Sequence, residues 1–381
     1  MAASSHSILG ASSAYRWMNC TPSAMYTKDI PDKTSPFAEE GTKAHAIAEK
    51  RLNHFIDTGT DIPQPAEMTD ADLDMWTNVS IYVDHCIDLY VSLKEKNGDA
   101  VMFVEQQVDF STWVPDGYGT ADCVILSGAD LYVRDLKYGK GVPVSAIDNP
   151  QARLYGLGAL AAFRDIYDIQ TVHNQIDQVR LEDGQSEEVI SITDLLTWAD
   201  TILAPAAQLA AQGKGSFKAG PWCRFCKAGA TCPHRAQQGN AVIAQSGKPI
   251  SELTDEQISR ILSVKNDVEK WMNSVEQYAV ERAQNGDPIA GWKLVEGRSV
   301  RTWSDELAVQ KRLEDNGFQE AEFTERKLYG ITKMTAAVGG KKEFNRLLGD
   351  LVVKPAGKPT LVPETDNRPA LEKPKAIDDF Q

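Results

Sequence analysis

The sequence predicts an α/β fold in which helices flank a mixed central sheet. Three strand-like runs, "AVMFVEQQVDF", "ADCVIL" and "LYVRDLK", follow one another closely in the middle of the chain. The helical stretch "QARLYGLGALAAF" comes next, and another strand-like run, "TVHNQIDQVRL", follows it. Three strands, a helix and a further strand are the order expected of an α/β domain.

Two helices are expected before these strands. Ser35 supplies a capping hydroxyl and Pro36 a proline at the first helical position, and "FAEEGTKAHAIAEKRLNHFI" continues with helical composition. A second helix is expected over "MTDADLDMWTNVSIYVDHCIDLYVSLKEK". In the same way, the pair Asn149-Pro150 predicts the start of the helix between the strands.

Beyond the strands, further helices are expected around 192–210 and 250–283, and "WKLVEGRSVRTW" resembles a strand or hairpin. From about Lys354 the chain is rich in proline and has little apolar periodicity, which predicts an extended or disordered tail. Three parts are therefore predicted, a core domain, a mostly helical extension and a flexible tail, over residues 1–240, 241–353 and 354–381.

Composition narrows the class of protein. The 381 residues carry a formal net charge of −14, with 42% hydrophobic and 25% charged residues, as in soluble globular proteins. No apolar run approaches membrane-spanning length and no secretory signal is recognisable, so we expect a cytoplasmic protein without a membrane partner. The acidic charge argues against tight passive DNA binding more than against DNA cleavage, because a metal-dependent nuclease needs carboxylates at its centre.

Three cysteines and a histidine lie close together in "GPWCRFCKAGATCPHRA". In a reducing cytoplasm such a cluster favours a metal over disulfides. Cys223, Cys226 and Cys232 follow a C-x₂-C-x₅-C spacing that suits zinc or an iron–sulfur cluster. His234 is near enough to complete a zinc site, although its spacing from Cys232 is unusually tight. A distant cysteine as the fourth ligand would instead indicate an iron–sulfur cluster.

Two aspartates and a lysine are predicted to share one face of a β-hairpin. Side chains alternate along a strand, so Asp135 and Lys137 of "LYVRDLK" point the same way. If Gly128-Ala129 forms a two-residue turn, Asp122 lies opposite Asp135 with Cβ atoms about 5 Å apart. Two like charges at that distance need neutralising, either by a divalent cation such as Mg²⁺ or by Lys137 alone.

These residues resemble the D…(D/E)-x-K core of the PD-(D/E)XK nuclease superfamily. "GTKAH", which ends at His45, resembles the upstream helical motif of its RecB-like branch, and "QARLY" resembles that branch's Q-x-x-x-Y motif. Gln151 and Tyr155 are four residues apart and therefore share a helical face. All these elements occur in the order of the family, although Ala121 stands where the family has proline.

The resemblance implies a restriction-endonuclease-like core and a Mg²⁺- or Mn²⁺-dependent DNA exonuclease. Three side chains and one backbone carbonyl are then expected to bind the metal: His45, Asp122, Asp135 and Leu136. Lys137 would orient or activate the attacking water, while Gln151 and Tyr155 would position the DNA strand. Glu105, on the preceding strand, is interpreted as part of a structural ion pair, with an outer metal ligand as the alternative.

A subgroup of these nucleases, including the AddB subunit and CRISPR-associated exonucleases, carries a 4Fe–4S cluster. One cysteine before the nuclease core and C-x₂-C-x₅-C after it hold this cluster. Cys20, in "SSAYRWMNC", occupies the early position, so the resemblance implies an iron–sulfur site of four cysteines: Cys20, Cys223, Cys226 and Cys232. Cys86 lies within a helix and Cys123 alternates with Asp122, so both are expected to be buried thiols.

Further segments, among them "GWKLVEGRSVRTW" and "GKPTLVPETDNRPAL", resemble a phage and prophage family assigned to this superfamily. This resemblance implies a recombination-type exonuclease in a bacterial host cell, often encoded beside a single-strand annealing or single-strand-binding protein. The acidic end "AIDDF" is a candidate docking segment for such a partner, with a solvated tail as the alternative. Two other functions stay open: a non-cutting nucleic-acid-binding scaffold, and a zinc-binding regulatory protein.

Overall fold

A computed structural model describes residues 7–31, 36–243, 249–287 and 289–293, with shorter pieces of the chain between 295 and 352. The chain divides into two compact units, Met1–Glu281 and Arg282–Gln381. Every residue expected to bind a metal or to act in catalysis belongs to the first unit. Helices of the second unit include α10 (Glu306–Asp315), α13 (Lys341–Leu348) and the 3₁₀ helix η5 (Gly349–Leu351).

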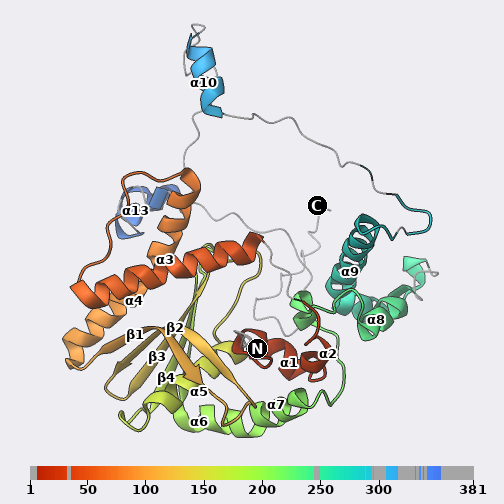
Figure 1. The fold of residues 1–381 in the computed structure, drawn as a ribbon, viewed down its shortest axis with the longest axis horizontal. Coiled ribbons are helices and arrows are strands. Elements are labelled where there is room, and N and C mark those ends of the chain that lie inside the picture. The colour runs from red at the N-terminus through yellow and green to blue at the C-terminus, as the bar shows by residue number, and fades with distance from the viewer. Residues whose placement is uncertain are drawn as a thin grey trace, which may run out of the picture. The chain divides into compact units, whose positions relative to one another are not determined.

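A five-stranded mixed sheet forms the centre of the first unit, with its strands in chain order across the sheet (Figure 1). The strands are β1 (Val101–Asp109), β2 (Tyr118–Ser127), β3 (Asp130–Lys137), β4 (Thr171–Gln178) and β5 (Gln185–Ser191). Only β3 and β4 run parallel, and α5 (Pro150–Phe163) lies in the connection between them. The predicted α/β fold with a mixed sheet is therefore confirmed.

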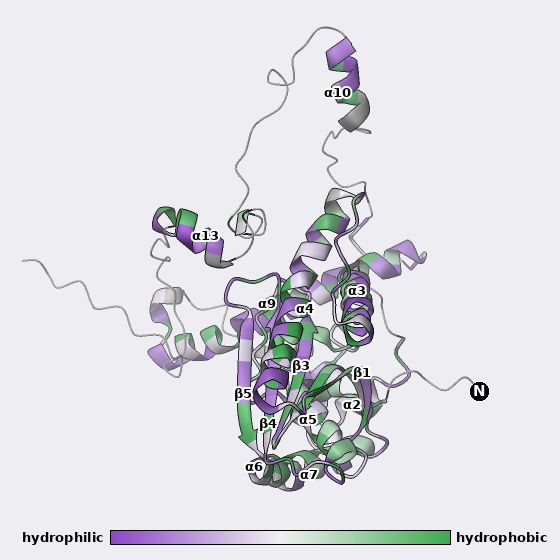
Figure 2. Cartoon of the chain, turned by 90° about the vertical axis from the view of Figure 1, so that its left-hand side faces the viewer, coloured by the Kyte–Doolittle hydropathy of each residue, from purple (hydrophilic) through white to green (hydrophobic). Residues whose placement is uncertain are grey.

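Helices cover both faces of this sheet. One face packs against α3 (Pro36–Thr58) and α4 (Asp70–Asn97), with Leu52, Val83 and Leu136 in the shared core. The other face packs against α5 and against a continuous helical run, divided into α6 (Ile192–Trp198), the π-helical segment η2 (Ala199–Leu203) and α7 (Ala204–Ala211). In Figure 2 the edge strand β5 is mainly hydrophilic up to its hydrophobic end.

The crossover helix α5 is held close to the sheet by its composition. The Asn149 side chain accepts hydrogen bonds from the backbone N–H groups of Gln151 and Ala152, which confirms the predicted cap. Small residues then let the backbone approach: a Cβ atom on Gly158 would lie 2.8 Å from the Cβ of Val108. Because α5 is almost entirely buried, the side chains at its first turns have fixed positions relative to β3.

The β2–β3 hairpin has the predicted turn and register. Gly128 has a φ of 58°, and Ser127 pairs with Asp130 across the two-residue turn. Asp99 fixes this turn, because its carboxylate accepts from the backbone N–H of Gly128 and from the Ser127 hydroxyl. Aspartates 122 and 135 are thereby brought to the far end of the hairpin.

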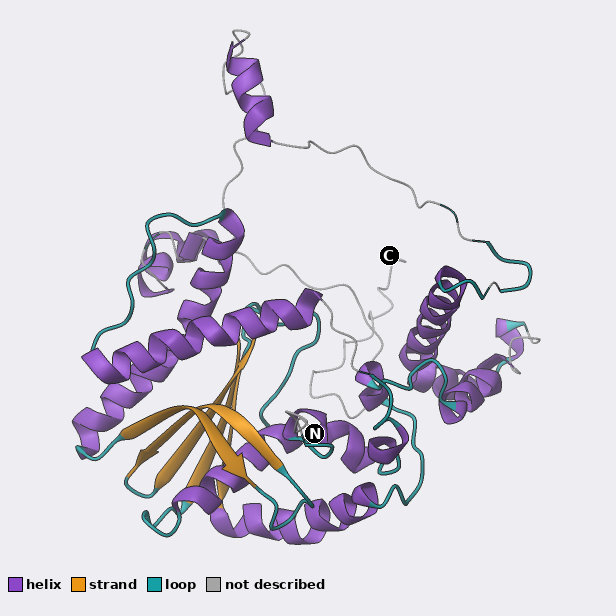
Figure 3. Cartoon of the chain, viewed as in Figure 1, coloured by secondary structure: helices purple, strands orange, loops and turns teal. Residues whose placement is uncertain are grey.

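The remaining described elements surround the cysteine segment. The N-terminal part contains η1 (Ala11–Ser13), α1 (Ala14–Asn19) and α2 (Ser23–Tyr26), none of which the sequence patterns indicated. After the core come η3 (Pro221–Phe225), α8 (Pro233–Ile243), η4 (Ile250–Glu252) and α9 (Asp255–Gln284). Helices and loops of this part are distinguished in Figure 3.

Three predictions fall wholly or partly outside the described residues. They concern the capping role of Ser35, most of the strand-like stretch "WKLVEGRSVRTW", and the tail over 354–381. Within the part that the structure describes, no helix combines the length and the apolar character needed to cross a membrane.

Candidate metal centre and cysteine pocket

Asp122 lies just beyond the last backbone-paired residues of the β2–β3 hairpin. The ladder ends at this side with Cys123 opposite Arg134, and the backbone N–H of Leu136 donates to Asp122 Oδ2 at 2.7 Å. Asp122 Oδ1 lies 3.3 Å from Nδ1 of His45, which α3 contributes. Two of the predicted metal ligands, from segments 77 residues apart in the chain, are therefore adjacent.

Glu105 on β1 is the third member of this group. One ligand atom from each of His45, Glu105 and Asp122 lies within 4.8 Å of the others. The backbone of Glu105 has a φ of 49°, in the left-handed region that glutamate rarely adopts, and the β1–β2 pairing is interrupted there. Among the described residues no ion pair joins Glu105 to a lysine or arginine, and its position beside His45 and Asp122 supports the alternative of a metal ligand.

Asp135 and Lys137 lie beside this group on β3. Lys137 Nζ is 2.6 Å from Asp135 Oδ2 and donates to Gln151 Oε1 at 3.2 Å. Asp135 is only 4% exposed, and its Oδ2 atom has no well-aligned hydrogen bond among the described residues. Oδ2 is thus ion-paired with Lys137, and since a carboxylate oxygen has more than one lone pair, this buried carboxylate can still contribute to cation binding.

Gln151 connects the carboxylate site to Tyr155. Its side-chain amide lies 3.3 Å from Asp135 Oδ1 and 3.3 Å from the Tyr155 hydroxyl. Tyr155 is 8% exposed, and its ring is packed so closely that a Cβ atom on Gly119 would lie 3.0 Å from it. The predicted shared face of Gln151 and Tyr155 is confirmed, and their role towards DNA stays a prediction.

Burial and clustered charge shift the pKa values of these groups. Burial raises the pKa of Glu105 to about 7, and the Asp122 carboxylate adds to this shift. Burial also raises the pKa of Asp135, although Lys137 opposes it. Burial of His45 disfavours its charged form, but the carboxylates of Asp122 and Asp135 outweigh this and raise its pKa. Acidic groups thus crowd the site in a way that a divalent cation would relieve.

The donor set fits Mg²⁺ or Mn²⁺. Both ions prefer carboxylate oxygens, and an imidazole nitrogen suits several first-row metals. The predicted ligands His45 and Asp122 belong to the tight group, while Asp135 adjoins it. For Leu136 the structure shows the N–H donated to Asp122, and the metal-binding role of its carbonyl stays a prediction.

The sequence contained a weak signal for Glu105. Counting along the β1–β2 ladder places it opposite Asp122, between the pairs Val104–Cys123 and Gln106–Ala121. That count depends on the register across the connection 110–117, which is too long for a turn rule to fix. The sequence therefore offered Glu105 only as an alternative outer ligand, and the structure places it beside His45 and Asp122.

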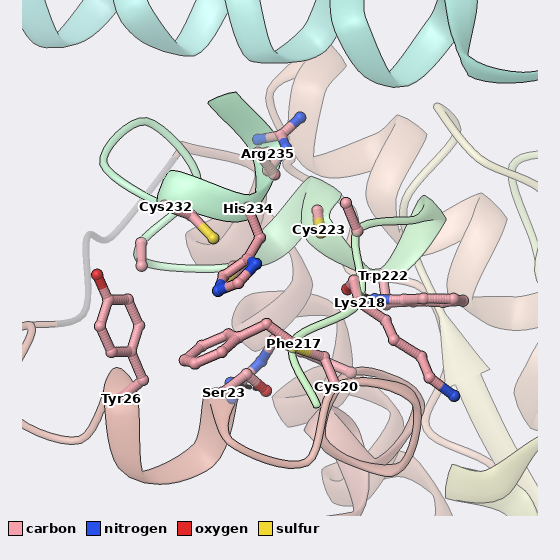
Figure 4. A pocket seen from close by; sticks show the side chains of 14 residues that line it. Cys20, Ser23, Tyr26, Phe217, Lys218, Trp222, Cys223, Cys232, His234 and Arg235 are labelled. Carbon is pink, nitrogen blue, oxygen red and sulfur yellow. Dashed lines mark hydrogen bonds between the residues drawn. The ribbon is translucent and has the colours of Figure 1, made fainter. Parts of the chain in front are cut away.

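A second group of side chains lies around one pocket. The four predicted iron–sulfur ligands all line it: Cys20, Cys223, Cys226 and Cys232. In Figure 4 the pocket lies between the N-terminal segment, which carries Cys20, and the segment after the core, which carries Cys223 and Cys232. Cys86 and Cys123 are elsewhere, 0% exposed in the core between α4 and the sheet, as predicted.

The cysteine sulfurs surround the pocket without converging on one point. Among the described residues, no three ligand atoms of these cysteines and His234 lie within 4.8 Å of one another. Zinc bonds of about 2.3 Å would hold sulfurs about 4 Å apart, whereas a 4Fe–4S cluster holds them farther apart because each cysteine binds a different iron. His234 lines the same pocket but is stacked on Phe217, with ring centroids 4.6 Å apart. Four cysteines around one pocket are a donor set that suits an iron–sulfur cluster, with zinc as the alternative.

The fold and these two groups define an α/β protein with a candidate metal centre on its sheet and a four-cysteine pocket. The chain belongs to the family DUF2800, described as "Protein of unknown function (DUF2800)", which matches residues 6–369. A solved structure described as "Crystal structure of SSO0001" is 14% identical to this chain. The match covers 58% of this chain and 96% of that one, with a TM-score of 0.22.

Proposed function

We propose that this chain is a divalent-metal-dependent deoxyribonuclease of the PD-(D/E)XK type that acts as an exonuclease on DNA ends. The observation that carries the proposal is the convergence of His45, Glu105 and Asp122 beside Asp135 and Lys137. Carboxylates that can hold a metal, next to a lysine ammonium, are the groups that phosphodiester hydrolysis uses.

In this proposal His45, Glu105 and Asp122 hold Mg²⁺ or Mn²⁺, with Asp135 and the carbonyl of Leu136 as further ligands. A metal bound there would polarise a phosphate oxygen and lower the pKa of a water. The hydrogen bond from Leu136 N–H to Asp122 fixes the orientation of that carboxylate.

The other residues act on the substrate. Lys137 is held between Asp135 and Gln151, so its ammonium is already oriented to stabilise charge that develops on the phosphate. Gln151 links Asp135 to Tyr155. Burial, reinforced by Asp135, raises the pKa of Tyr155, which keeps its hydroxyl a hydrogen-bond donor for positioning the strand.

Cleavage assays with matched variants test this function. We expect Asp135→Asn and Lys137→Met each to reduce Mn²⁺-dependent cleavage of end-labelled DNA by about 100-fold or more. Asp130→Asn removes the same charge from the half-exposed start of β3 and serves as the control. Full activity in either site variant would contradict the proposed mechanism. Cleavage of closed circular DNA would contradict the assignment as an exonuclease.

The proposal includes a structural 4Fe–4S cluster in the cysteine pocket. Such a cluster would tie the segment of Cys20 to the segment after the core, and hydrolysis needs no redox step from it. We expect anaerobically purified protein to be brown and to contain iron and sulfide, and Cys20→Ser to lose most of this iron. Cys86→Ala, which changes a buried thiol away from the pocket, should keep it. Colourless protein that contains zinc would instead support the zinc alternative.

Through the family resemblance, the proposal extends to phage recombination in the cytoplasm of a bacterial host. A single-strand annealing or single-strand-binding protein would then be the partner, with the acidic end "AIDDF" as its docking segment. Deletion of residues 354–381 should weaken a pull-down of such a partner. Undiminished partner binding after the deletion would remove the docking role from the proposal.

A further inference from the structure

Carboxylates are missing from the two segments that meet at the cysteine pocket. The chain contains 54 aspartates and glutamates, yet none occurs in residues 1–28 or in residues 201–251. The second segment carries six cations: Lys214, Lys218, Arg224, Lys227, Arg235 and Lys248. In a chain with a net charge of −14, the described lining of this pocket contains three cations, Arg16, Lys218 and Arg235, and no carboxylate.

Aromatic side chains of the same two segments are exposed. Phe225 is 80% exposed, with the guanidinium of Arg224 5.4 Å from its ring centroid. Tyr15 is 50% exposed and meets Trp222 edge-on, with ring centroids 5.9 Å apart. Exposed rings beside cations provide stacking faces and charge together, a combination that suits a ligand with flat bases and phosphates.

This surface contacts the loop that follows β3, the strand of Asp135 and Lys137. A Cβ atom on Gly141 would lie 4.0 Å from the guanidinium of Arg224, and Gly141 is only four residues beyond Lys137. The loop that contains Gly141 is held in place by Gln178, which donates to the carbonyl of Val142 at 2.8 Å. A strand bound along Arg224 would thus pass the loop that follows Lys137.

We propose that this cation–aromatic surface, formed by Tyr15, Lys218, Trp222, Arg224 and Phe225, binds single-stranded nucleic acid. Stacking on Phe225 and Tyr15 requires unpaired bases, because duplex bases have their faces covered by their neighbours. Lys218 and Arg224 contact the phosphates. The guidance of this strand to the metal centre depends on the proposed nuclease function, whereas the binding itself does not.

Binding without catalysis tests the inference. Fluorescence anisotropy with a labelled oligothymidylate of about 20 nucleotides, in EDTA, measures affinity while no cleavage takes place. We expect Arg224→Glu/Phe225→Ala to weaken binding about 10-fold or more. Arg164→Glu/Ile166→Ala makes comparable changes at exposed positions after α5 and should bind like the wild type. Equal affinity of the two double variants would overturn the inference.

Two additional measurements separate binding from misfolding and from catalysis. Arg224 and Phe225 stand between two cysteine ligands, so Lys218→Glu, outside that loop, should also weaken binding while iron content stays at the wild-type level. A duplex of the same length should bind more weakly than the single strand, and equal or tighter duplex binding would contradict base stacking. If the surface variants weaken binding but the wild type shows no Mn²⁺-dependent cleavage, this inference holds and the proposed nuclease function is contradicted.

Discussion

Removing the charge of Glu105 tests the metal centre before any substrate is involved. In Glu105→Gln the shape of the side chain and the backbone conformation are kept while the carboxylate is lost. Burial and Asp122 raise the pKa of Glu105 from 4.5 to about 7, so the ionised side chain destabilises the metal-free fold. The glutamine variant should therefore be more stable than the wild type when no metal is bound.

The size of this effect follows from the pKa. A change of the pKa from 4.5 to about 7 corresponds to at most ~3.4 kcal/mol, and solvent screening of this half-buried side chain reduces the effect to about 1–2 kcal/mol. The folded state holds the proton more tightly than the unfolded chain. The free energy of unfolding therefore falls as pH rises from about 4.5 to about 7 and stays lower above that range.

Thermal unfolding in EDTA at two pH values measures the difference. At about pH 8 we expect Tm of Glu105→Gln to exceed that of the wild type by about 2–6 °C, and at about pH 4 the gain should vanish. Saturating Mn²⁺ should reverse the order, because it stabilises the wild type by about 3 kcal/mol at about 100 times Kd and the variant by less. Glu95→Gln, at an exposed position of α4, is the control. A variant less stable than the wild type in EDTA at about pH 8 would refute the reasoning.

Three further variants test the packing of α5 and a buried ion pair, each by urea unfolding. Gly158→Ala should lower the free energy of unfolding by about 1–2 kcal/mol, because its new methyl would meet Val108 at 2.8 Å. Gly41→Ala, in open space within α3, should raise the free energy of unfolding by about 0.5–1 kcal/mol. Higher stability of both variants would contradict the close approach of α5 to the sheet. Asp177→Asn should cost about 3 kcal/mol, because it leaves the buried Arg134, now bonded to both oxygens of Asp177, without its counter-ion. An unchanged unfolding midpoint would show that this pair is not needed for stability.

The parts of the site that could be predicted from sequence are those that local rules fix. The β2–β3 register follows from a two-residue turn, so the positions of Asp122 and Asp135 could be counted outward from Gly128. The face shared by Gln151 and Tyr155 follows from helical periodicity, and Asn149 starts that helix at the expected position. These features require no knowledge of how distant segments meet.

Features that depend on contacts between distant segments of the chain were harder to predict from the sequence. The strand β5 was missed because its residues are polar and alternate between exposed and half-buried positions, as expected of an edge strand. Spacing alone could not relate Cys20 to cysteines about 200 residues later, and only the family resemblance suggested their association. The structure brings Cys20 to the same pocket as Cys223, Cys226 and Cys232, through the packing of α1 and α2 against α7.

Net charge was the least informative property of this sequence, since it averages over segments with opposite roles. A total of −14 argues against a nucleic-acid-binding protein when charges are spread evenly. Here residues 1–28 and 201–251 contain no carboxylates, while Glu105 and Asp122 lie together with His45 at one point on the sheet. A nuclease needs both arrangements at once, a negative centre that attracts a cation and a positive approach that holds phosphates. The separation of charge along the chain therefore agrees with the proposed function, although the total charge does not suggest it.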